Sequence, residues 1–317
     1  MAAHNSVNER AFFEAQQYSQ FILTNLHDGL LPDGFTRDVS DFGTGSVLDI
    51  KTVGSASIQD VAESQALKYN KIDTGTIKMF ITDYVGDAWS ISDELREDGA
   101  QIEQLAAMRA MEATRAMQEN FESRFLETAA AGIAPGTAGV VNGFAHRTMA
   151  TGTGGVVTLQ DLVSMKLAFD KANVPAAGRI AIVDPVVEAS LNSLVTQTNA
   201  INFNPMFEGF VQGGFAQEHK FVINIMGFDI YTSNRLPGQA TETIGSTTIA
   251  NNVQNVFMSV LDDNTKPVMR AWRRMPNAEG WRETELREDR FHVTSRFGFG
   301  VQRNDSLGVI VTSAVNY

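Results

Sequence analysis

The sequence predicts a protein of the α+β class, in which one long helix is combined with several extended strands. Residues 99–131 lack proline and consist mainly of strong helix formers. Two β-prone runs, over residues 47–53 and 76–84, alternate apolar and polar side chains. Residues 268–311 are also rich in this alternation, which is typical of strands that bury one face.

Composition excludes several classes of protein. The chain has 317 residues, of which 43% are hydrophobic, so it can bury a large core. Acidic residues outnumber basic residues by 37 to 25, and this acidic balance disfavours ordinary nucleic-acid binding. Cysteine is absent, which excludes disulfides and thiolate-bound metals. We expect no membrane span and no secretion signal, because no apolar run is long enough and residues 1–10 are polar.

The N-terminal part is predicted to be a helix followed by an extended arm. Residues 8–26 place apolar side chains mostly on one helical face, and Gly29 is positioned to end the helix. Residues 37–45 are polar and contain two glycines. They form either a surface linker or an arm that binds another subunit.

Residues 46–84 are predicted to form a long β excursion. Its two β-prone runs are separated by a polar and charged stretch over residues 55–74. Isolated two-stranded hairpins are only marginally stable in water, so we expect this excursion to lie against another surface.

The long helix over residues 99–131 is expected to cross the whole molecule. Asp98 and Gln101 form a capping-box-like start, and Gly132 ends the helix. At 1.5 Å per residue the helix is ~45 Å long, more than the width of a small domain. One apolar stripe is predicted to be its buried face: Ile102, Leu105, Ala106, Ala110, Ala113, Met117, Phe121 and Phe125.

The middle of the chain predicts a mixed α/β unit. A helix over residues 158–172 is capped by Thr158, a buried strand covers residues 179–183, and a second helix covers residues 186–195. Residues 221–232 are expected to form paired strands.

The last third is expected to be mostly β. Strands are predicted over residues 268–274, 281–287, 291–301 and 307–311. The turn between the first two is assigned to Pro276, Asn277 and Gly280.

No catalytic, cofactor-binding or metal-binding residues are predicted. The five histidines are far apart and lack the spacing of a helical metal site. The run from Gly152 to Gly155 resembles a phosphate loop, but it lacks the third glycine and the lysine of the known fingerprints. We favour a flexible loop here, and a soluble α/β enzyme that uses this loop is the weaker alternative.

The basic residues of the last third are interspersed with acidic ones. We therefore favour an ion-pair lattice, within or between subunits, over a phosphate-binding patch. Trp272 and Trp281 are expected to be core or interface anchors. The basic residues concerned are Arg270, Arg273, Arg274 and Arg282.

Two phrases resemble a known family. Residues 88–104 read AWSISDELREDGAQIEQ and lead into the long helix, and residues 172–185 read ANVPAAGRIAIVDP. In this order the elements resemble the major capsid proteins of tailed bacteriophages, which share the Hong Kong 97-type fold. In that family a strand followed by S-x-E-L-x-x-D opens the spine helix. Here these positions are Ser92, Glu94, Leu95 and Asp98.

The resemblance implies a division of the chain. It assigns an N-arm, an extended β loop, a peripheral domain that contains the spine helix, and an axial domain. The corresponding residues are 1–45 for the N-arm, 46–80 for the extended loop, 81–155 with 256–300 for the peripheral domain, and 156–255 with 301–317 for the axial domain.

The resemblance also implies a function. The chain would be a structural subunit, without enzymatic activity or cofactors, that self-assembles into hexamers and pentamers of an icosahedral capsid. It would be part of the virion, assembled in the host cytoplasm, and the shell would enclose packaged double-stranded DNA that the subunit contacts non-specifically. A portal protein would be a partner, scaffolding and decoration proteins would be optional further partners, and no membrane would be involved. The alternative within the same fold is an encapsulin-like compartment shell.

Candidate site residues are therefore residues of the subunit interface. They are Phe12, Phe13 and Phe21 in the arm, Lys51, Lys68 and Lys71 in the loop, and Arg270, Arg273, Arg274, Arg282, Glu283, Glu285 and Arg287 in the last third. Some family members join subunits by a Lys–Asn isopeptide bond. Asn277 and Asn304 are conceivable acceptors, but the spacing identifies no pair, and salt bridges are the default role for the lysines.

Overall fold

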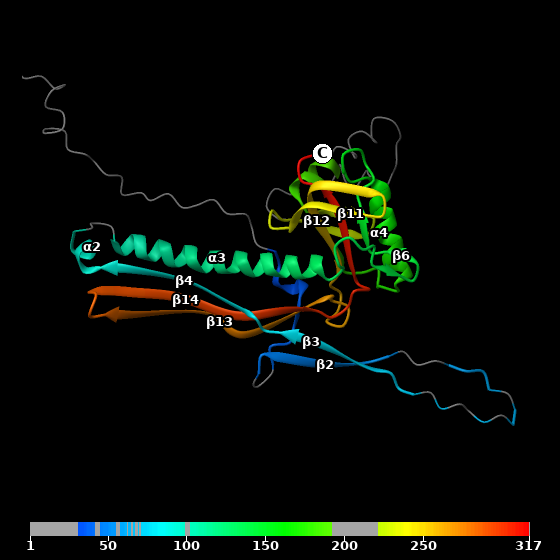
Figure 1. Cartoon of the computed structure of the whole chain (residues 1–317), viewed down its shortest axis with the longest axis horizontal. Coiled ribbons are helices and arrows are strands. Elements are labelled where there is room, and N and C mark those ends of the chain that lie inside the picture. The colour runs from blue at the N-terminus through cyan, green and yellow to red at the C-terminus, as the bar shows by residue number, and fades with distance from the viewer. Residues whose placement is uncertain are drawn as a thin grey trace, which may run out of the picture.

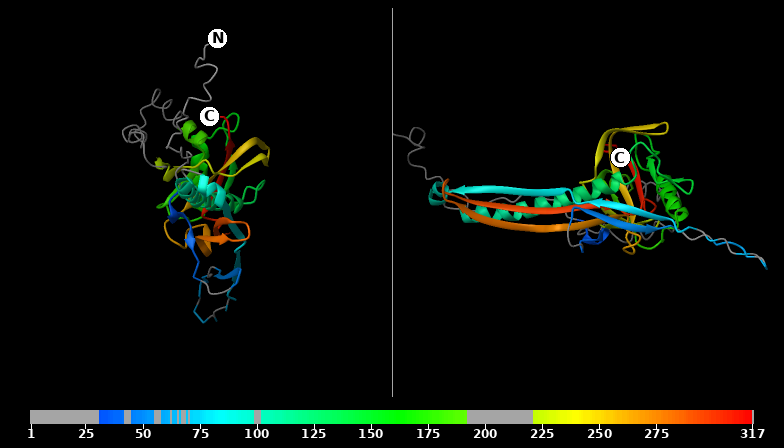
Figure 2. Two further views of the ribbon diagram at one scale, coloured as in Figure 1. Left: turned by 90° about the vertical axis from the view of Figure 1, so that its left-hand side faces the viewer. Right: turned by 60° about the horizontal axis from the view of Figure 1, so that its bottom comes forward.

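The computed structural model describes residues 31–41, 45–54, 58–61, 63–64, 66, 69, 71–98, 102–191 and 221–316. The helix predicted over residues 8–26 lies outside these residues. The described part is elongated: a long helix runs beside long strands, a more compact unit lies at one end, and a narrow hairpin projects from that region (Figures 1 and 2).

The long helix is α3 (Ile102–Ala131), preceded by the short helix α2 (Asp93–Asp98). It lies along a sheet with the order β1-β13-β14-β4 in the described part of the chain (Figure 1). The strands of this sheet are β1 (Arg37–Asp38), β4 (Asp83–Ser92), β13 (Val268–Glu283) and β14 (Glu288–Val301). The predicted long helix is thus present. The β run predicted over residues 76–84 is divided between two strands: residues 76–80 belong to β3 (Thr74–Phe80), and residues 83–84 begin β4, which leads into α2.

Aromatic side chains hold the C-terminal half of α3 against the sheet. Phe121 stacks on Trp272 with ring centroids 4.6 Å apart and an interplanar angle of 9°. Phe297 and Phe299 lie at 5.0 and 4.7 Å from the Phe121 ring. The predicted apolar stripe is buried at Ala113, Met117 and Phe125 but not at Leu105, which is 50% exposed. The N-terminal half of the helix therefore has a weaker attachment than the pattern indicates.

The turn predicted at Pro276, Asn277 and Gly280 is wrong. These residues lie within β13, and the turn to β14 is formed by residues 284–287. The β13–β14 register shifts between Trp272 and Arg274 and again between Arg274 and Asn277. Such bulges allow a strand to continue through a proline, whose missing N–H cannot join the ladder.

The predicted β excursion forms a hairpin. Strand β2 (Val47–Val53) pairs antiparallel with β3 (Thr74–Phe80), in a register that runs from Val47↔Phe80 to Val53↔Thr74. Only its base is packed: Met79 and Ile81 are buried in a small core with Met269 and Ala271 of β13. The remainder projects away from the body (Figure 2).

The compact unit contains the second sheet, with the order β7-β15-β12-β8-β10-β9 and β11 paired with β12. The predicted helix α4 (Leu159–Lys171) and the fully buried strand β8 (Arg179–Val183) are confirmed, and residues 185–191 are helical. The remaining strands are β7 (Arg147–Met149), β9 (Phe221–Ile225), β10 (Phe228–Thr232), β11 (Gly238–Ile244), β12 (Thr247–Ser259) and β15 (Leu307–Ser313). Shorter pieces are η1 (Asp33–Phe35), β5 (Val140–Val141) and β6 (Phe144–Ala145).

One large core joins the spine helix to the second sheet. Leu126 and Ala129 of α3 belong to the same buried cluster as Phe169 of α4, Phe228 of β10 and Phe257 of β12. The three phenylalanine rings meet edge to face, with centroids 5.5 and 5.2 Å apart. The end of α3 is therefore part of the folding core of the compact unit.

We predict that Leu126→Ala lowers the free energy of unfolding by about 2–5 kcal/mol, because the side chain is fully buried and its loss leaves a cavity. Leu105→Ala on the exposed part of the same helix serves as the control, with an expected effect within about 0.5 kcal/mol. Urea unfolding of dissociated subunits measures both. Equal effects of the two substitutions would contradict the packing described here.

Candidate functional site: the surfaces of an elongated subunit

Among the described residues, no group of three or more His, Asp or Glu side chains is placed to hold a metal ion. No helix in the described ranges is long and apolar enough to cross a membrane.

The glycine loop over residues 152–155 is held by the C-terminal end of the chain. The Gly155 carbonyl accepts a hydrogen bond from the Ser313 N–H at 2.9 Å, and the Gly154 carbonyl accepts one from Asn316 Nδ2 at 2.7 Å. A depression of about 550 Å³ lies beside the loop, and the described residues that line it include no charged side chain. Within the described part of the chain, the loop therefore has no neighbouring cation that would neutralise a phosphate.

The same region contains the predicted helix cap. Asp161 is buried, and its carboxylate accepts hydrogen bonds from the N–H and hydroxyl groups of both Thr151 and Thr158, at 2.8–3.1 Å. The threonine-rich segment before α4 is thus fixed to the first turn of the helix, and the role predicted for Thr158 is confirmed.

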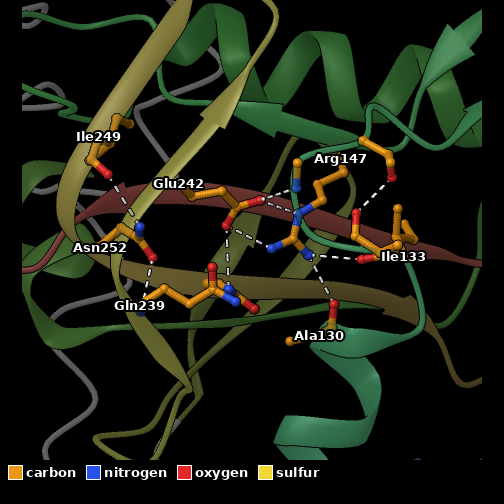
Figure 3. Close-up of polar contacts among 11 residues, drawn as sticks. Ala130, Ile133, Arg147, Gln239, Glu242, Ile249 and Asn252 are labelled. Atoms are coloured by element: carbon orange, nitrogen blue, oxygen red, sulfur yellow. Dashed lines mark hydrogen bonds and ion pairs between the residues drawn. The ribbon is translucent and has the colours of Figure 1, made fainter.

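A buried ion pair joins the end of α3 to the β11–β12 hairpin (Figure 3). Arg147 and Glu242 form a bidentate pair at 2.7 and 2.8 Å, and their side chains are 0% and 2% exposed. Arg147 Nη1 also donates to the carbonyls of Ala130 and Ile133, at 2.9 and 3.0 Å. A cation at these carbonyls is favoured by the partial negative charge at a helix C-terminus.

Glu242 is fully engaged in this cluster. Besides Arg147, it accepts hydrogen bonds from the Gly136 N–H at 3.1 Å and from Gln254 Nε2 at 3.3 Å. Burial raises the pKa of its carboxyl, but the hydrogen bonds from Arg147 and Gly136 and the charge of Arg147 together lower that pKa below its ordinary value. The group is therefore held as a carboxylate, which suits a permanent structural pair.

A second, exposed group of ion pairs lies at the opposite end of the spine. Arg282 of β13 contacts Asp93 at 2.6 Å and Asp289 at 3.2 Å, and Arg96 of α2 contacts Asp289 at 2.8 Å. The hydrogen bond from Arg282 is the main reason that the pKa of Asp93 is lowered. The backbone carbonyl of Arg287 accepts a hydrogen bond from the Asp93 N–H at 3.1 Å. We call these residues, Asp93, Arg96, Arg282, Arg287 and Asp289, the distal lattice.

Further charges predicted at the interface are paired within the chain. Arg270 lies 3.6 Å from Asp38, Arg274 pairs with Glu279, and Glu283 lies 3.5 Å from Arg290. Arg273 and Glu285 have exposed side chains. Ion pairs of the predicted lattice are thus present within one subunit. Contacts of these residues between subunits stay a prediction.

The two tryptophans of β13 have different roles. Trp272 is half-buried and stacks on Phe121 of α3, so it packs against the spine helix of its own chain. Trp281 is 46% exposed and touches His292, with centroids 5.0 Å apart, so it does not anchor the core of the described chain.

The other predicted interface residues lie partly outside the described chain. Lys51 Nζ donates to Thr76 Oγ1 across the hairpin at 3.1 Å, and Lys71 is exposed. The amide of Asn277 donates to Glu279 at 2.8 Å, and Asn304 is exposed. Residues outside the described ranges are Phe12, Phe13, Phe21 and Lys68.

The structure reveals interface candidates that the sequence analysis did not select. Around the hairpin, Val53, Ile58, Tyr69 and Ile72 are 75%, 98%, 99% and 70% exposed. The signal in the sequence was that Ile58, Tyr69 and Ile72 are apolar residues within the otherwise polar stretch over residues 55–74.

Comparison with known proteins identifies the class of the chain. The family model described as "Phage capsid protein" matches residues 75–312 of the 317. The fold resembles that of a capsid structure of the cyanophage P-SCSP1u, with 16% identity, TM-score 0.70, and coverage of 97% of this chain and 94% of that one. A structure from Mycobacterium phage Che8 has 16% identity, TM-score 0.66, and coverage of 94% and 97%.

An encapsulin is also similar in fold. In the holo-SrpI encapsulin complex from Synechococcus elongatus, the shared fold covers 100% of this chain and 98% of that chain, with 11% identity and TM-score 0.60. No curated protein sequence matches the chain significantly.

The family match, on an elongated body with a projecting hairpin (Figure 1), identifies the class as a structural protein of capsids. The chain belongs to the phage capsid protein family. The predicted Hong Kong 97-type fold and the role as a structural subunit of the virion capsid, which assembles from copies of itself, are confirmed.

We predict that Glu242→Gln lowers the free energy of unfolding at neutral pH by about 3–5 kcal/mol, because it breaks a buried pair and leaves Arg147 uncompensated. The folded pKa of Glu242 is below its ordinary value of 4.5, so its stabilising contribution exists above that value and is lost as the pH falls through the folded pKa. Thermal unfolding between neutral pH and about pH 3 should show a steeper acid loss for the unmodified chain than for the variant. Parallel curves would contradict this assignment.

Proposed function

We propose that the chain is the major capsid protein of a tailed phage, whose copies form hexamers and pentamers that close into an icosahedral shell around double-stranded DNA. The observation that carries this proposal is the β2–β3 hairpin, which projects from the body (Figure 2) and whose outer part exposes Val53, Ile58, Tyr69 and Ile72. A monomer gains nothing from such a feature, whereas a neighbouring copy would cover it.

The energetic argument concerns burial between copies. Each exposed apolar side chain that a neighbour covers stabilises the contact by roughly 25 cal/mol per Å². A closed shell repeats the same contact for every copy, so modest contacts add up to a stable assembly. Every copy in the shell is the same chain. A copy whose hairpin lies over one neighbour must therefore also have a surface that binds the hairpin of another neighbour.

The division into domains follows the same proposal. Residues 1–45 act as the N-arm and residues 46–80 as the loop that overlaps a neighbour. The peripheral domain, residues 81–155 and 256–300, contains the spine and the distal lattice. The axial domain, residues 156–255 and 301–317, surrounds the five-fold and six-fold contacts. The compact second sheet supports this last assignment, since most of its strands lie in these ranges.

The partners proposed for this protein follow from the shell. The formal charge of −12 suits a container whose inner wall contacts DNA without sequence specificity and without holding it tightly. A portal protein would occupy one vertex, and scaffolding or decoration proteins would assist assembly. We propose no catalytic activity and no cofactor for the chain.

The encapsulin-like compartment is retained as the second candidate. The similarity in fold to the encapsulin complex, over all of this chain, is the observation that favours it. Content distinguishes the two: a phage capsid encloses a genome, and a compartment encloses protein cargo.

We predict that Ile58→Ser combined with Tyr69→Ser abolishes closed shells but leaves folded subunits or capsomers, since both side chains are almost fully exposed before assembly. Leu261→Ser, at an exposed apolar residue of the compact unit, is the matched control and should still form shells. Negative-stain electron microscopy and sedimentation measure assembly, and circular dichroism measures folding. Normal shells from the double variant would rule out the hairpin as an essential contact.

A second prediction addresses the contents of particles isolated from the native source. They should contain DNA that resists added nuclease, and their ultraviolet absorbance should be dominated by nucleic acid. Particles that instead contain a stoichiometric folded enzyme and no DNA would support the compartment and contradict the phage capsid.

A further inference from the structure

The β2–β3 hairpin is attached to the body at one small site on the first sheet. Phe297 and Phe299 of β14 pack against the spine helix. Because side chains alternate along a strand, Gly298 and Gly300 face the opposite side of the sheet. Their cross-strand partners in β13 complete the site. We call the four residues the hairpin seat: Met269, Ala271, Gly298 and Gly300.

The end of β3 lies directly on this seat. Met79 and Ile81 are 1% and 2% exposed, and they share a small core with the two β13 residues of the seat. A Cβ atom added to Gly298 would lie 2.8 Å from Ile81 Cα, well inside the roughly 3.5–4.0 Å that two carbon atoms prefer. It would also overlap the carbonyl oxygen of Phe80, a backbone atom that cannot rotate away. The crossing of the two strands therefore requires glycine at position 298.

The second glycine of the seat has a different neighbour. A Cβ atom added to Gly300 would lie 3.0 Å from Met79 Cγ. A methionine side chain has three rotatable bonds and adapts to irregular spaces. A methyl group at Gly300 is therefore accommodated by a side-chain movement, whereas one at Gly298 meets fixed backbone.

The two strands of the hairpin form one unit beyond the seat. The Ile81 N–H donates to the Ser46 carbonyl at 2.9 Å, which joins the two chain segments at the root. From there β2 and β3 pair without a register shift as far as Val53 and Thr74. Val53 is 75% exposed, and the hairpin projects from the body (Figure 2). Its direction relative to the sheet therefore depends on the contact at the root.

We propose that Gly298 is a positioning residue that sets the angle at which the hairpin leaves the subunit. A methyl group at this position requires β3 to rise by about 1 Å to reach ordinary carbon–carbon separation. Across the ~7 Å between Met79 and Ile81, that rise tilts the hairpin by about 8°. At the far end of strands that are ~23 Å long, the tilt becomes a displacement of about 3 Å.

The consequence for assembly rests on the proposed function. The exposed apolar residues of the hairpin lie beyond the strands, so their displacement is at least as large as that of Val53. The angle set at Gly298 then decides which part of a neighbouring copy these residues meet.

Spin labels measure the angle in the subunit itself, because the chain has no cysteine of its own. One label is attached through Val53→Cys on the hairpin, and the other through Thr114→Cys on α3 or Ser164→Cys on α4, all at exposed positions. In full-length dissociated subunits, pulsed electron resonance should show that Gly298→Ala changes the mean distance by at least ~2 Å in one of the two pairs. Gly34→Ala is the matched control, since a Cβ atom there meets nothing within 4 Å, and its distances should not change.

A graded series separates a change of angle from a loss of folding. Circular dichroism shows which variants are folded, and unchanged distances in folded Gly298→Ala would overturn the proposal. Gly300→Ala should change the same distances by less, because Met79 yields. Should Gly298→Ala not fold, Gly300→Ala decides: a smaller shift supports the proposal, and identical distances overturn it.

Shell formation is a separate readout. Folded Gly298→Ala subunits should give aberrant shells or none in negative-stain electron microscopy, and Gly34→Ala subunits should give normal shells. Normal shells from subunits with a displaced hairpin would contradict the link between the angle and assembly. Failure of the unmodified chain to form shells would contradict the proposed function, whereas the distances in the subunit would still test the role of Gly298.

Discussion

The buried pair of Arg147 and Glu242 is the interaction on which the shape of this subunit depends. It lies where α3 ends, and it connects the Ala130 carbonyl in the last turn of that helix, and the Ile133 carbonyl just after it, to the β11–β12 hairpin of the second sheet. A guanidinium in this position uses its fixed, planar set of donors to hold two elements at one angle. Because water is excluded from the site, removal of either side chain leaves the other charge buried and unpaired. A junction that keeps only one of the two side chains is therefore unstable.

The fold could be predicted where the signal is local. The long helix, α4 with its Thr158 cap, and strand β8 each follow from patterns within a few residues. The turn from Asn173 to Arg179 also has a local basis: Gly178 has a φ of +67°, and a Cβ atom there would lie 2.9 Å from the backbone of Leu261. Only glycine combines that conformation with so close an approach.

The rest depends on contacts that are distant in sequence. Strand β12 was missed because it carries polar residues, yet Asn255 is buried and donates to the Ile310 carbonyl and to Thr312 of β15. The course of β13 through Pro276 depends on bulges against β14. Arg147 and Glu242 are 95 positions apart and belong to no motif. At the candidate interface, the alternation of acidic and basic residues predicted ion pairs. It did not show which of these pairs would form within one subunit.

The two ends of the spine are held by different physical means, and this difference bears on how the subunit deforms. At the root, the bidentate pair is excluded from water and is scarcely affected by salt. At the tip, Arg282 is 46% exposed at its side chain and its pairs with Asp93 and Asp289 are screened by ions. We therefore expect the tip to yield to load more readily than the root, so that identical copies differ in curvature mainly where the exposed charges rearrange.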